Sequence, residues 1–180
     1  DGTSIPKAEP LMYYALNKPR GILSAVSDPR NRKTVRDLIP VSGTLYPVGR
    51  LDEDSEGLVL MTNDGELANR LTHPKYEHEK EYKVLVARQP DEQQLDAIRH
   101  GIILEDGHRT APARVTLENS YGKGAWLRII LKEGRKRQIR EMGDRIGLPV
   151  VRILRIRIGN LKLGNLKPGE WRALLPDEVR

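Results

Sequence analysis

Apolar and polar residues follow two different periods along this chain. Residues 57–62 (GLVLMT) form an apolar run between turn residues, which predicts a buried strand. Residues 79–87 alternate strictly, so that Tyr82, Val84 and Val86 share one face, as in a strand. Further strands are expected at residues 11–16, 114–118, 125–131, 150–158 and near 171–174.

Three segments have the spacing of short helices. One follows Asn63 or Asp64 as a cap and ends at residues 73–74, and one covers residues 91–100. The third covers residues 135–146 and carries the apolar stripe Ile139, Met142 and Ile146. Residues 35–39 predict a single helical turn. Because strands outnumber helices and do not alternate with them, we predict an α+β fold with a mixed, mostly antiparallel sheet.

The composition supports a folded chain with an aliphatic core. Leu, Ile and Val supply 47 of the 180 residues, and Phe is absent. The chain has no Cys, which excludes disulfide scaffolds, thiolate zinc sites and cysteine nucleophiles. No apolar run approaches the roughly 18 residues of a membrane helix, and no signal peptide opens the sequence. We therefore expect a cytoplasmic protein without a membrane anchor.

Positive charge is concentrated in one segment. The net charge is +6, and residues 132–157 alone hold nine basic and three acidic residues. Such a segment is typical of proteins that bind a polyanion. The alternative is a solvated helix face on which Arg137 pairs with Glu141 and Arg140 with Asp144, at helical i,i+4 spacing.

An acidic loop is the other unusual stretch. Residues 49–57 (GRLDEDSEG) place four carboxylates and one arginine between glycines, directly before the predicted buried strand. Such loops are favoured places for catalytic groups. The alternatives are an ordinary polar turn and a calcium loop, but the stretch lacks EF-hand spacing. The sequence also lacks metal-ligating His spacing, a GxGxxG motif and a P-loop, which disfavours hydride and phosphoryl transfer.

Five motifs together resemble a known family. They are LNKPRG at 16–21, YPVGRLD at 46–52 continuing to TNDG at 62–65, KEYKV at 80–84, EGRKRQIR at 133–140 and LRIRIG at 154–159. In this order they resemble the ribosomal small-subunit pseudouridine synthase A family, which includes large-subunit enzymes. The resemblance covers residues 11–175. It implies the pseudouridine synthase fold, two lobes around a central cleft, and isomerisation of one uridine in ribosomal RNA without cofactor or metal.

The resemblance also assigns roles to individual residues. Asp52 falls on the catalytic aspartate, Tyr82 on the tyrosine that stacks on the base, and Arg140 on the arginine that pairs with the aspartate. Leu154 falls on an apolar residue beneath the site, and Arg50 on an arginine that fills the space of the extruded nucleotide. Further RNA-binding candidates are Lys18, Arg20, Arg135, Lys136, Arg137 and Arg155.

This assignment makes chemical sense. The reaction must break the N1–C1′ bond, turn the base and join C5 to C1′, and a carboxylate can add to the sugar or base or take a proton from C2′. A carboxylate buried alone tends to be protonated, so an arginine partner keeps it ionised and orients it. The target base is out of reach in a stacked helix and must flip out.

Some features depart from the family. Residues 1–10 resemble the linker or remnant of a missing S4-like N-terminal RNA-binding domain, and residues 11–180 form the catalytic domain. Glu141 stands where Arg is common, and Lys136 where Asn is common. We expect a monomer that acts on ribosomal RNA or a pre-ribosomal particle. The competing hypotheses are an RNA-binding module without catalysis and a nucleoside hydrolase that releases uracil.

Overall fold

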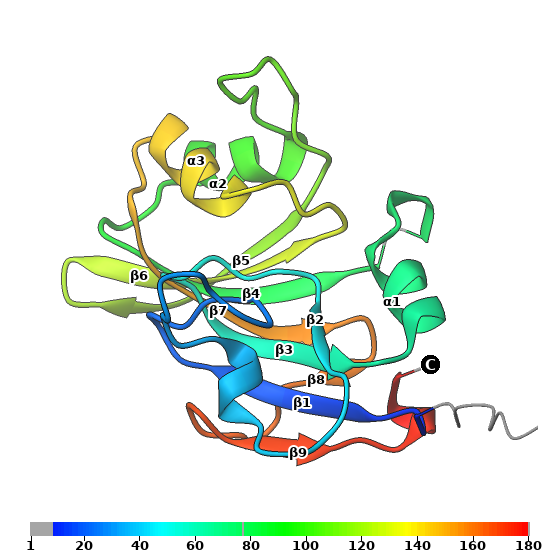
Figure 1. The fold of residues 1–180 in the computed structure, drawn as a ribbon. Coiled ribbons are helices and arrows are strands. Elements are labelled where there is room, and N and C mark those ends of the chain that lie inside the picture. The colour runs from blue at the N-terminus through cyan, green and yellow to red at the C-terminus, as the bar shows by residue number, and fades with distance from the viewer. Residues whose placement is uncertain (1–8, 77, 180) are drawn as a thin grey trace, which may run out of the picture.

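A computed structural model describes residues 9–76 and 78–179 (Figure 1). Residues 1–8 of the predicted linker lie outside the described part. The strands are β1 (Tyr13–Lys18), β2 (Tyr46–Val48), β3 (Glu56–Thr62), β4 (Lys80–Val86), β5 (Arg114–Tyr121), β6 (Gly124–Leu131), β7 (Val150–Ile158), β8 (Leu161–Lys162) and β9 (Trp171–Ala173). The α-helices are α1 (Gly65–Thr72), α2 (Glu92–His100) and α3 (Gln138–Arg145), and 3-10 turns cover Val35–Leu38, Pro74–Tyr76 and Pro176–Val179.

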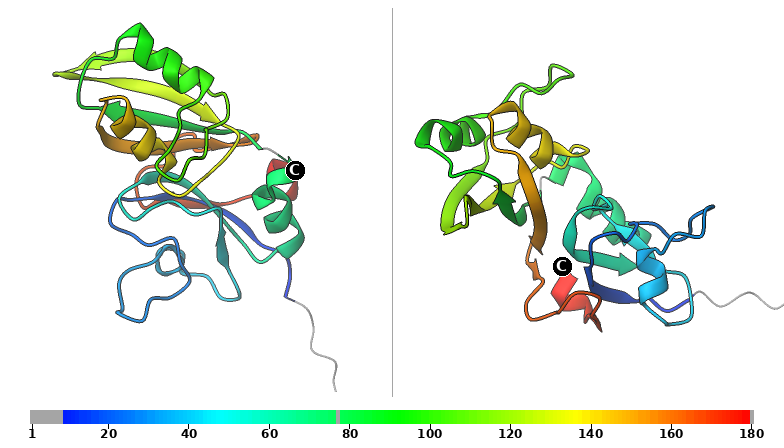
Figure 2. Two further views of the ribbon diagram at one scale, coloured as in Figure 1. Left: turned by 90° about the horizontal axis from the view of Figure 1, so that it is seen from above. Right: turned by 90° about the vertical axis from the view of Figure 1, so that its left-hand side faces the viewer.

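One mixed sheet runs through the molecule in the order β5-β6-β4-β7-β3-β1-β9, with β2 beside β3 and β8 beside β7. Its pairings are antiparallel except that of β3 with β7. We call the part with β1, β2, β3, β9 and α1 lobe one, and the part with β4 to β7, α2 and α3 lobe two (Figure 2). The predicted α+β fold with a mostly antiparallel sheet is confirmed.

The two lobes join through a very short parallel pairing. Glu56 pairs with Leu154 and Gly57 with Arg155, and the ladder between β3 and β7 comprises these two pairs. Gly57 has φ of 115°, and a β-carbon there would lie 2.3 Å from the Arg155 carbonyl oxygen. Only glycine fits both the positive φ and the close approach. The joint therefore requires glycine at this position.

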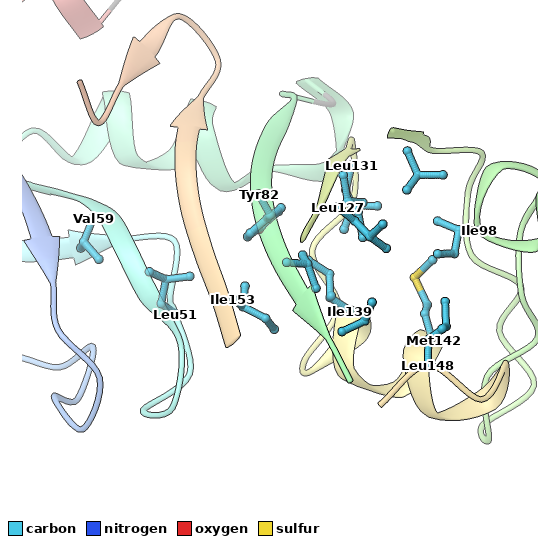
Figure 3. Packing of buried hydrophobic residues seen from close by; sticks show 14 of the residues in the cluster. Leu51, Val59, Tyr82, Ile98, Leu127, Leu131, Ile139, Met142, Leu148 and Ile153 are labelled. Atoms are coloured by element: carbon cyan, nitrogen blue, oxygen red, sulfur yellow. The ribbon is translucent and has the colours of Figure 1, made fainter. Parts of the chain in front are cut away.

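The core lies on both faces of lobe one, whereas in lobe two it lies mainly on the face covered by α2 and α3, with β7 also contributing to the opposite face. The larger cluster lies between the sheet and α2 and α3, extends into lobe one, and includes Leu51, Tyr82 and Ile153 (Figure 3). The second cluster packs on the opposite face of lobe one, around Leu58 and Leu60. Strand β3 contributes to both clusters, which explains why its sequence is apolar throughout rather than alternating.

The remaining differences from the predicted elements have local causes. Helix α3 begins at Gln138 rather than at residue 135, because Arg137 has a left-handed backbone with φ of 56°. Strands β5 and β6 extend into the loop predicted at 119–124 and leave only Gly122 and Lys123 to turn. Strands β2 and β8 have three and two residues, too few for a periodic pattern to show.

Candidate active site

The acidic loop, residues 49–55, connects β2 to β3 directly above the joint between the lobes. Leu51 is buried and fixes the loop to lobe one, because its N–H donates to Ser24 Oγ and its carbonyl accepts from the same hydroxyl. The neighbouring Asp52 side chain keeps 30% of its surface exposed. An anchored backbone thus presents a partly exposed carboxylate.

Lys18 lies beneath this loop rather than on the surface. Its side chain is fully buried, and Nζ donates to the carbonyl oxygens of Pro19 and Glu53, both at 3.1 Å. Burial lowers the pKa of Lys18 to about 8, although Asp54, Glu53 and other nearby carboxylates oppose the decrease. The prediction that Lys18 contacts RNA is wrong for this structure, since Lys18 instead fixes the loop from below.

Arg137 comes from lobe two and meets the loop across the cleft. Its two terminal nitrogens lie 3.3 and 3.2 Å from the two carboxylate oxygens of Asp54, and Nη1 lies 3.6 Å from Asp52 Oδ2. The left-handed backbone at Arg137 is uncommon for a residue other than glycine and is typical of functional sites. Asp52 is therefore paired with an arginine, but a different one from the residue predicted.

Arg140 completes the arrangement from the first turn of α3. Its Nη2 donates to the Asp54 carbonyl oxygen at 3.2 Å, and Nε lies 3.4 Å from Asp54 Oδ2 without hydrogen-bond geometry. The predicted direct pair of Arg140 with Asp52 is thus corrected to a pair with Asp54. The alternative of helix-surface pairs is also wrong, because Arg137 and Arg140 bind the acidic loop and not Glu141 and Asp144.

Asp54 is the shared partner that the sequence analysis missed. Burial raises the pKa of Asp54, but hydrogen bonding from Arg137 and the charges of Arg140 and Arg137 outweigh it, so the net pKa is lowered. Conversely, hydrogen bonding from Asp54 raises the pKa of Arg137. The only sequence signal was its place two residues after Asp52 in the acidic loop, which does not reveal its partners.

Tyr82 and Arg155 form a buried pair on neighbouring strands. They face each other in the ladder of β4 with β7, and Arg155 Nε donates to the Leu58 carbonyl oxygen at 2.9 Å. Its Nη2 lies 3.5 Å from the carbonyl oxygen of Gly49, at the start of the acidic loop. Burial lowers the pKa of Arg155, and its interaction with Tyr82 opposes this. Arg155 is only 2% exposed and is bound to backbone carbonyl oxygens, so in this conformation it does not reach RNA and its contact with RNA stays a prediction.

Leu154 lies on the other face of β7. It packs against the second core cluster with Leu58 and Leu60, so its predicted place beneath the site is wrong. Side chains alternate along a strand, and Arg155 takes the face of Tyr82. On that face, Ile153 lies between Leu51 and Tyr82 (Figure 3).

An open pocket of about 450 Å³ lies at the meeting of the acidic loop and the turn before α3. Its volume is within the range of small-molecule sites, roughly 300–1,000 Å³. Arg20 contributes to it and links the lobes, since it donates to the carbonyl oxygens of Asp54 and Val151. The lining residues are Arg20, Gly21, Asp52, Glu53, Asp54, Lys136 and Arg137. Asp52 and the basic turn therefore share one cavity, whereas Tyr82 lies in the core next to Leu51.

The other predicted residues are placed as follows. Arg50 and Lys136 are exposed, and Arg135 is exposed and paired with Asp106. Their contacts with RNA stay predictions. Across the described ranges, no three His, Asp or Glu side chains gather as a metal site would need. In the same ranges, no helix has the length and hydropathy to span a membrane.

Comparison with known proteins gives consistent matches. The sequence pattern described as RNA pseudouridylate synthase matches residues 12–143. Ribosomal large subunit pseudouridine synthase B of Bacillus subtilis is 41% identical over 183 residues, covering all of this chain and 74% of that protein. Ribosomal large subunit pseudouridine synthase E of Xanthomonas campestris is 42% identical over 179 residues, covering 89% of this chain and 94% of that protein.

Solved structures agree with the sequence matches. A crystal structure of a pseudouridylate synthase superposes with a TM-score of 0.84 at 33% identity, over 96% of this chain and 74% of that one. An H/ACA ribonucleoprotein bound to a substrate RNA matches with a TM-score of 0.62 at 16% identity, over 84% of this chain and 48% of that one. The second match shows that the fold is shared.

Proposed function

Because this chain belongs to the RNA pseudouridylate synthase family, we propose that Asp52 is the carboxylate on which its reaction depends. The protein is an isomerase that converts uridine in RNA to pseudouridine. The observation that supports Asp52 is its position: a partly exposed carboxylate on an anchored loop, in an open pocket, beside a guanidinium from the other lobe. We propose that this arrangement keeps Asp52 ionised and oriented.

The pocket is suited to a nucleotide that has left its helix. Cations from both lobes, Arg20 and Lys136, border the pocket and can hold the phosphates on either side of a flipped nucleotide. Asp52 then reaches the sugar or base, either by adding to it or by taking a proton from C2′. In both routes the uracil detaches, turns, and is rejoined through C5.

Tyr82 and the aliphatic residues around it are proposed to retain the detached base. Tyr82 is buried with Leu51 and Ile153, so the base reaches its ring only if the lobes or the acidic loop move on RNA binding. The short joint between β3 and β7 is compatible with such a movement. We assign Tyr82 the role of stacking on the base, and Arg155 that of holding Tyr82 and Gly49 at the correct separation.

We further propose ribosomal RNA as the substrate, with the large-subunit RNA as the first to test, because relatives that match most of this chain are named for it. The chain is proposed to act as a monomer in the cytoplasm. The absence of cysteine fits a reducing compartment.

The test is tritium release from ribosomal RNA that carries 5-tritiated uridine, with the protein and its Asp52→Asn variant. We expect the wild type to release tritium and the variant to lose at least about 1,000-fold in turnover, since a nucleophile or base is removed without changing the shape of the side chain. RNA binding and the free energy of unfolding should change little. Near wild-type turnover in the variant would refute the role of Asp52.

Chromatography of the same reaction separates the two alternatives. A nucleoside hydrolase would release free uracil, whereas an isomerase retains the base in the RNA as pseudouridine. A binding module would bind RNA and give neither product. Mapping of the pseudouridine in the RNA then identifies the modified position.

A further inference from the structure

The proposed reaction creates an anion that needs a partner. When the N1–C1′ bond breaks, its electron pair leaves with the uracil, whether Asp52 forms a bond to C1′ or removes a proton from C2′. The charge spreads from N1 to the two carbonyl oxygens of the base. Fixed donors aimed at a developing negative charge are among the largest contributions to catalysis. A cation or another fixed donor near Tyr82 would therefore stabilise the detached base.

Most cations around the site, whether buried or exposed, are already bound. Lys18, Arg20 and Arg155 donate to backbone carbonyl oxygens. Arg137 and Arg140 bind Asp54, and Arg157 binds Glu81 and Glu79. Engaging the base with any of these would break a hydrogen bond or ion pair that the folded protein already makes.

Lys80 is different. It is half-buried at the start of β4, and within the described residues its ammonium has no hydrogen bond and no ion pair. Its neighbours Glu79 and Glu81 are both occupied by Arg157. Burial, followed by the charge of Arg155, lowers the pKa of Lys80, and no carboxylate opposes the decrease. The group is thus held in unfavourable surroundings without a partner in the protein.

The position of Lys80 connects Tyr82 to the pocket. Residues two apart on a strand share a face, so Lys80 lies on the face of β4 that Tyr82 occupies. A β-carbon on Gly134 would lie 3.6 Å from Lys80 Nζ, so the ammonium lies against the turn that carries Lys136 and Arg137. The ammonium therefore lies on the Tyr82 face of β4 and against the turn whose next residues, Lys136 and Arg137, line the pocket.

From this geometry we propose that Lys80 is a further catalytic residue, whose ammonium binds the uracil anion while it is detached from the ribose. The inference rests on the proposed function. Lys80 donates a hydrogen bond to a carbonyl oxygen of the base, and the proton stays on the lysine. The electron pair of the N1–C1′ bond remains on the base until C5 forms the new bond to C1′, and this step releases the Asp52 carboxylate from C1′ or, in the other route, is matched by return of the proton to C2′. C5 then loses its hydrogen as a proton and N1 takes up a proton, so the net change is an isomerisation.

The chain supplies a matched control for the test. Lys83 is on the same strand but on the opposite face, where its ammonium lies 5.5 Å from the Trp126 ring centroid. Lys80→Met and Lys83→Met remove the same charge and keep a similar length. The single-turnover rate is measured with the enzyme in saturating excess over a uridine-containing RNA. RNA affinity is measured separately at several salt concentrations.

We expect Lys80→Met to lower the saturated rate by roughly 100- to 1,000-fold, the usual effect of removing one such donor. RNA affinity should stay within about threefold, and Lys83→Met should match the wild type in both measurements. A saturated rate within threefold of the wild type would overturn the inference. So would a loss confined to affinity and salt dependence, because that result would assign Lys80 to an RNA phosphate.

A pH profile separates a catalytic role from a structural one. If the reaction needs the charged form of Lys80, the rate of the wild type should fall as the pH rises through the lowered pKa of Lys80. Lys80→Arg should be active, unlike Lys80→Met, and its rate should fall only at higher pH, because arginine keeps its charge there. Among the described residues, Arg155 is the charged group that acts on Lys80, and Tyr82 shares its face of β4. Both variants retain these two residues, so a shift of the alkaline limb is assigned to residue 80. An unmoved limb contradicts the proposal, whereas a wild type that makes no pseudouridine contradicts the proposed function instead.

Discussion

Two lysines, one in each lobe, lie in similar surroundings but differ in their partners. Lys18 of β1 is fully buried, donates to two carbonyl oxygens and has several carboxylates nearby. Lys80 of β4 is half-buried, has neither kind of partner in the described residues, and lies close to the positive charge of Arg155. Burial lowers the pKa of both groups.

The difference separates a structural cation from one available to a ligand. At Lys18 the folded protein supplies hydrogen bonds and nearby carboxylates that offset part of the cost of burial, although burial still lowers the pKa to about 8, and these bonds hold the acidic loop. At Lys80 the cost of burial is not offset within the chain, and such a cost persists at functional sites. Each prediction below tests part of this contrast.

The largest effect on the free energy of unfolding is expected from disrupting the joint between lobe one and lobe two. Gly57→Ala places a β-carbon 2.3 Å from the Arg155 carbonyl oxygen, at a positive φ, in the joint that holds the lobes together. We expect a loss of about 3 kcal/mol or more in the free energy of unfolding, measured by urea denaturation. Gly122→Ala is the control, because Gly122 also has a positive φ but no atom within 4 Å of the added carbon, and should lose only about 1 kcal/mol. Equal losses would mean that the joint tolerates a side chain.

The next effect compares the lysines directly. Lys18→Met removes the Lys18 hydrogen bond to the Pro19 carbonyl oxygen and one of the two hydrogen bonds to the Glu53 carbonyl oxygen, which keeps the Gly21 N–H as a donor. This loss should lower the free energy of unfolding by about 2 kcal/mol. Lys80→Met removes a half-buried charge that has no partner to lose, so its free energy of unfolding should fall little or rise. Urea denaturation of both variants at neutral pH measures this. Equal destabilisation would contradict the distinction.

A smaller, pH-dependent effect sharpens the description of Lys18. Its pKa is about 8 in the folded protein and ordinarily 10.5, so between these values the unfolded chain binds more protons than the folded one. Stability therefore rises with pH across this window, and the contribution is lost as the pH falls through 8. The free energy of unfolding of the wild type minus that of Lys18→Met should increase from pH 8 to 10.5. A flat difference would show that the folded protein keeps Lys18 protonated.

The smallest effect is expected on RNA affinity, from an exposed lysine that serves as a reference for Lys18 and Lys80. Lys136 lines the pocket on the surface, and Lys136→Gln should weaken RNA binding and reduce the slope of log affinity against log salt by about one. Lys123→Gln, in the turn between β5 and β6, should leave the slope unchanged. Filter binding at increasing salt measures both. Identical slopes for the two variants would place the RNA away from Lys136.

The fold and the centre of the site could be predicted from the sequence, but side-chain partners could not. Period-two alternation and apolar runs located the long strands, and the motif around Asp52 located the acidic loop. Nothing in the spacing distinguishes Asp52 from Asp54 as the partner of an arginine 86 residues away from Asp54. That choice depends on how two lobes meet.

Burial of charge was the other property that the sequence concealed. Lysine and arginine are ordinarily exposed, so Lys18 and Arg155 were assigned to RNA, although both are buried and bound to backbone carbonyl oxygens. The prediction for Leu154 failed for a related reason: Leu154 was expected beneath the site, but its side chain lies on the face of β7 opposite to that of Arg155. A motif places residues on an element, whereas the face depends on strand register, here shifted by an irregularity between Glu81 and Tyr82.

At Arg137 the backbone conformation is locally unfavourable, but the side chain makes contacts that link the two lobes. For a residue other than glycine this conformation costs about 1 kcal/mol, which Arg137→Gly would release. The same change would delete the guanidinium that spans the cleft to Asp52 and Asp54. Efforts to make the protein more heat-resistant by relaxing strained positions should therefore leave residue 137 untouched, since a gain in stability there would come with loss of the contacts that hold the proposed active site.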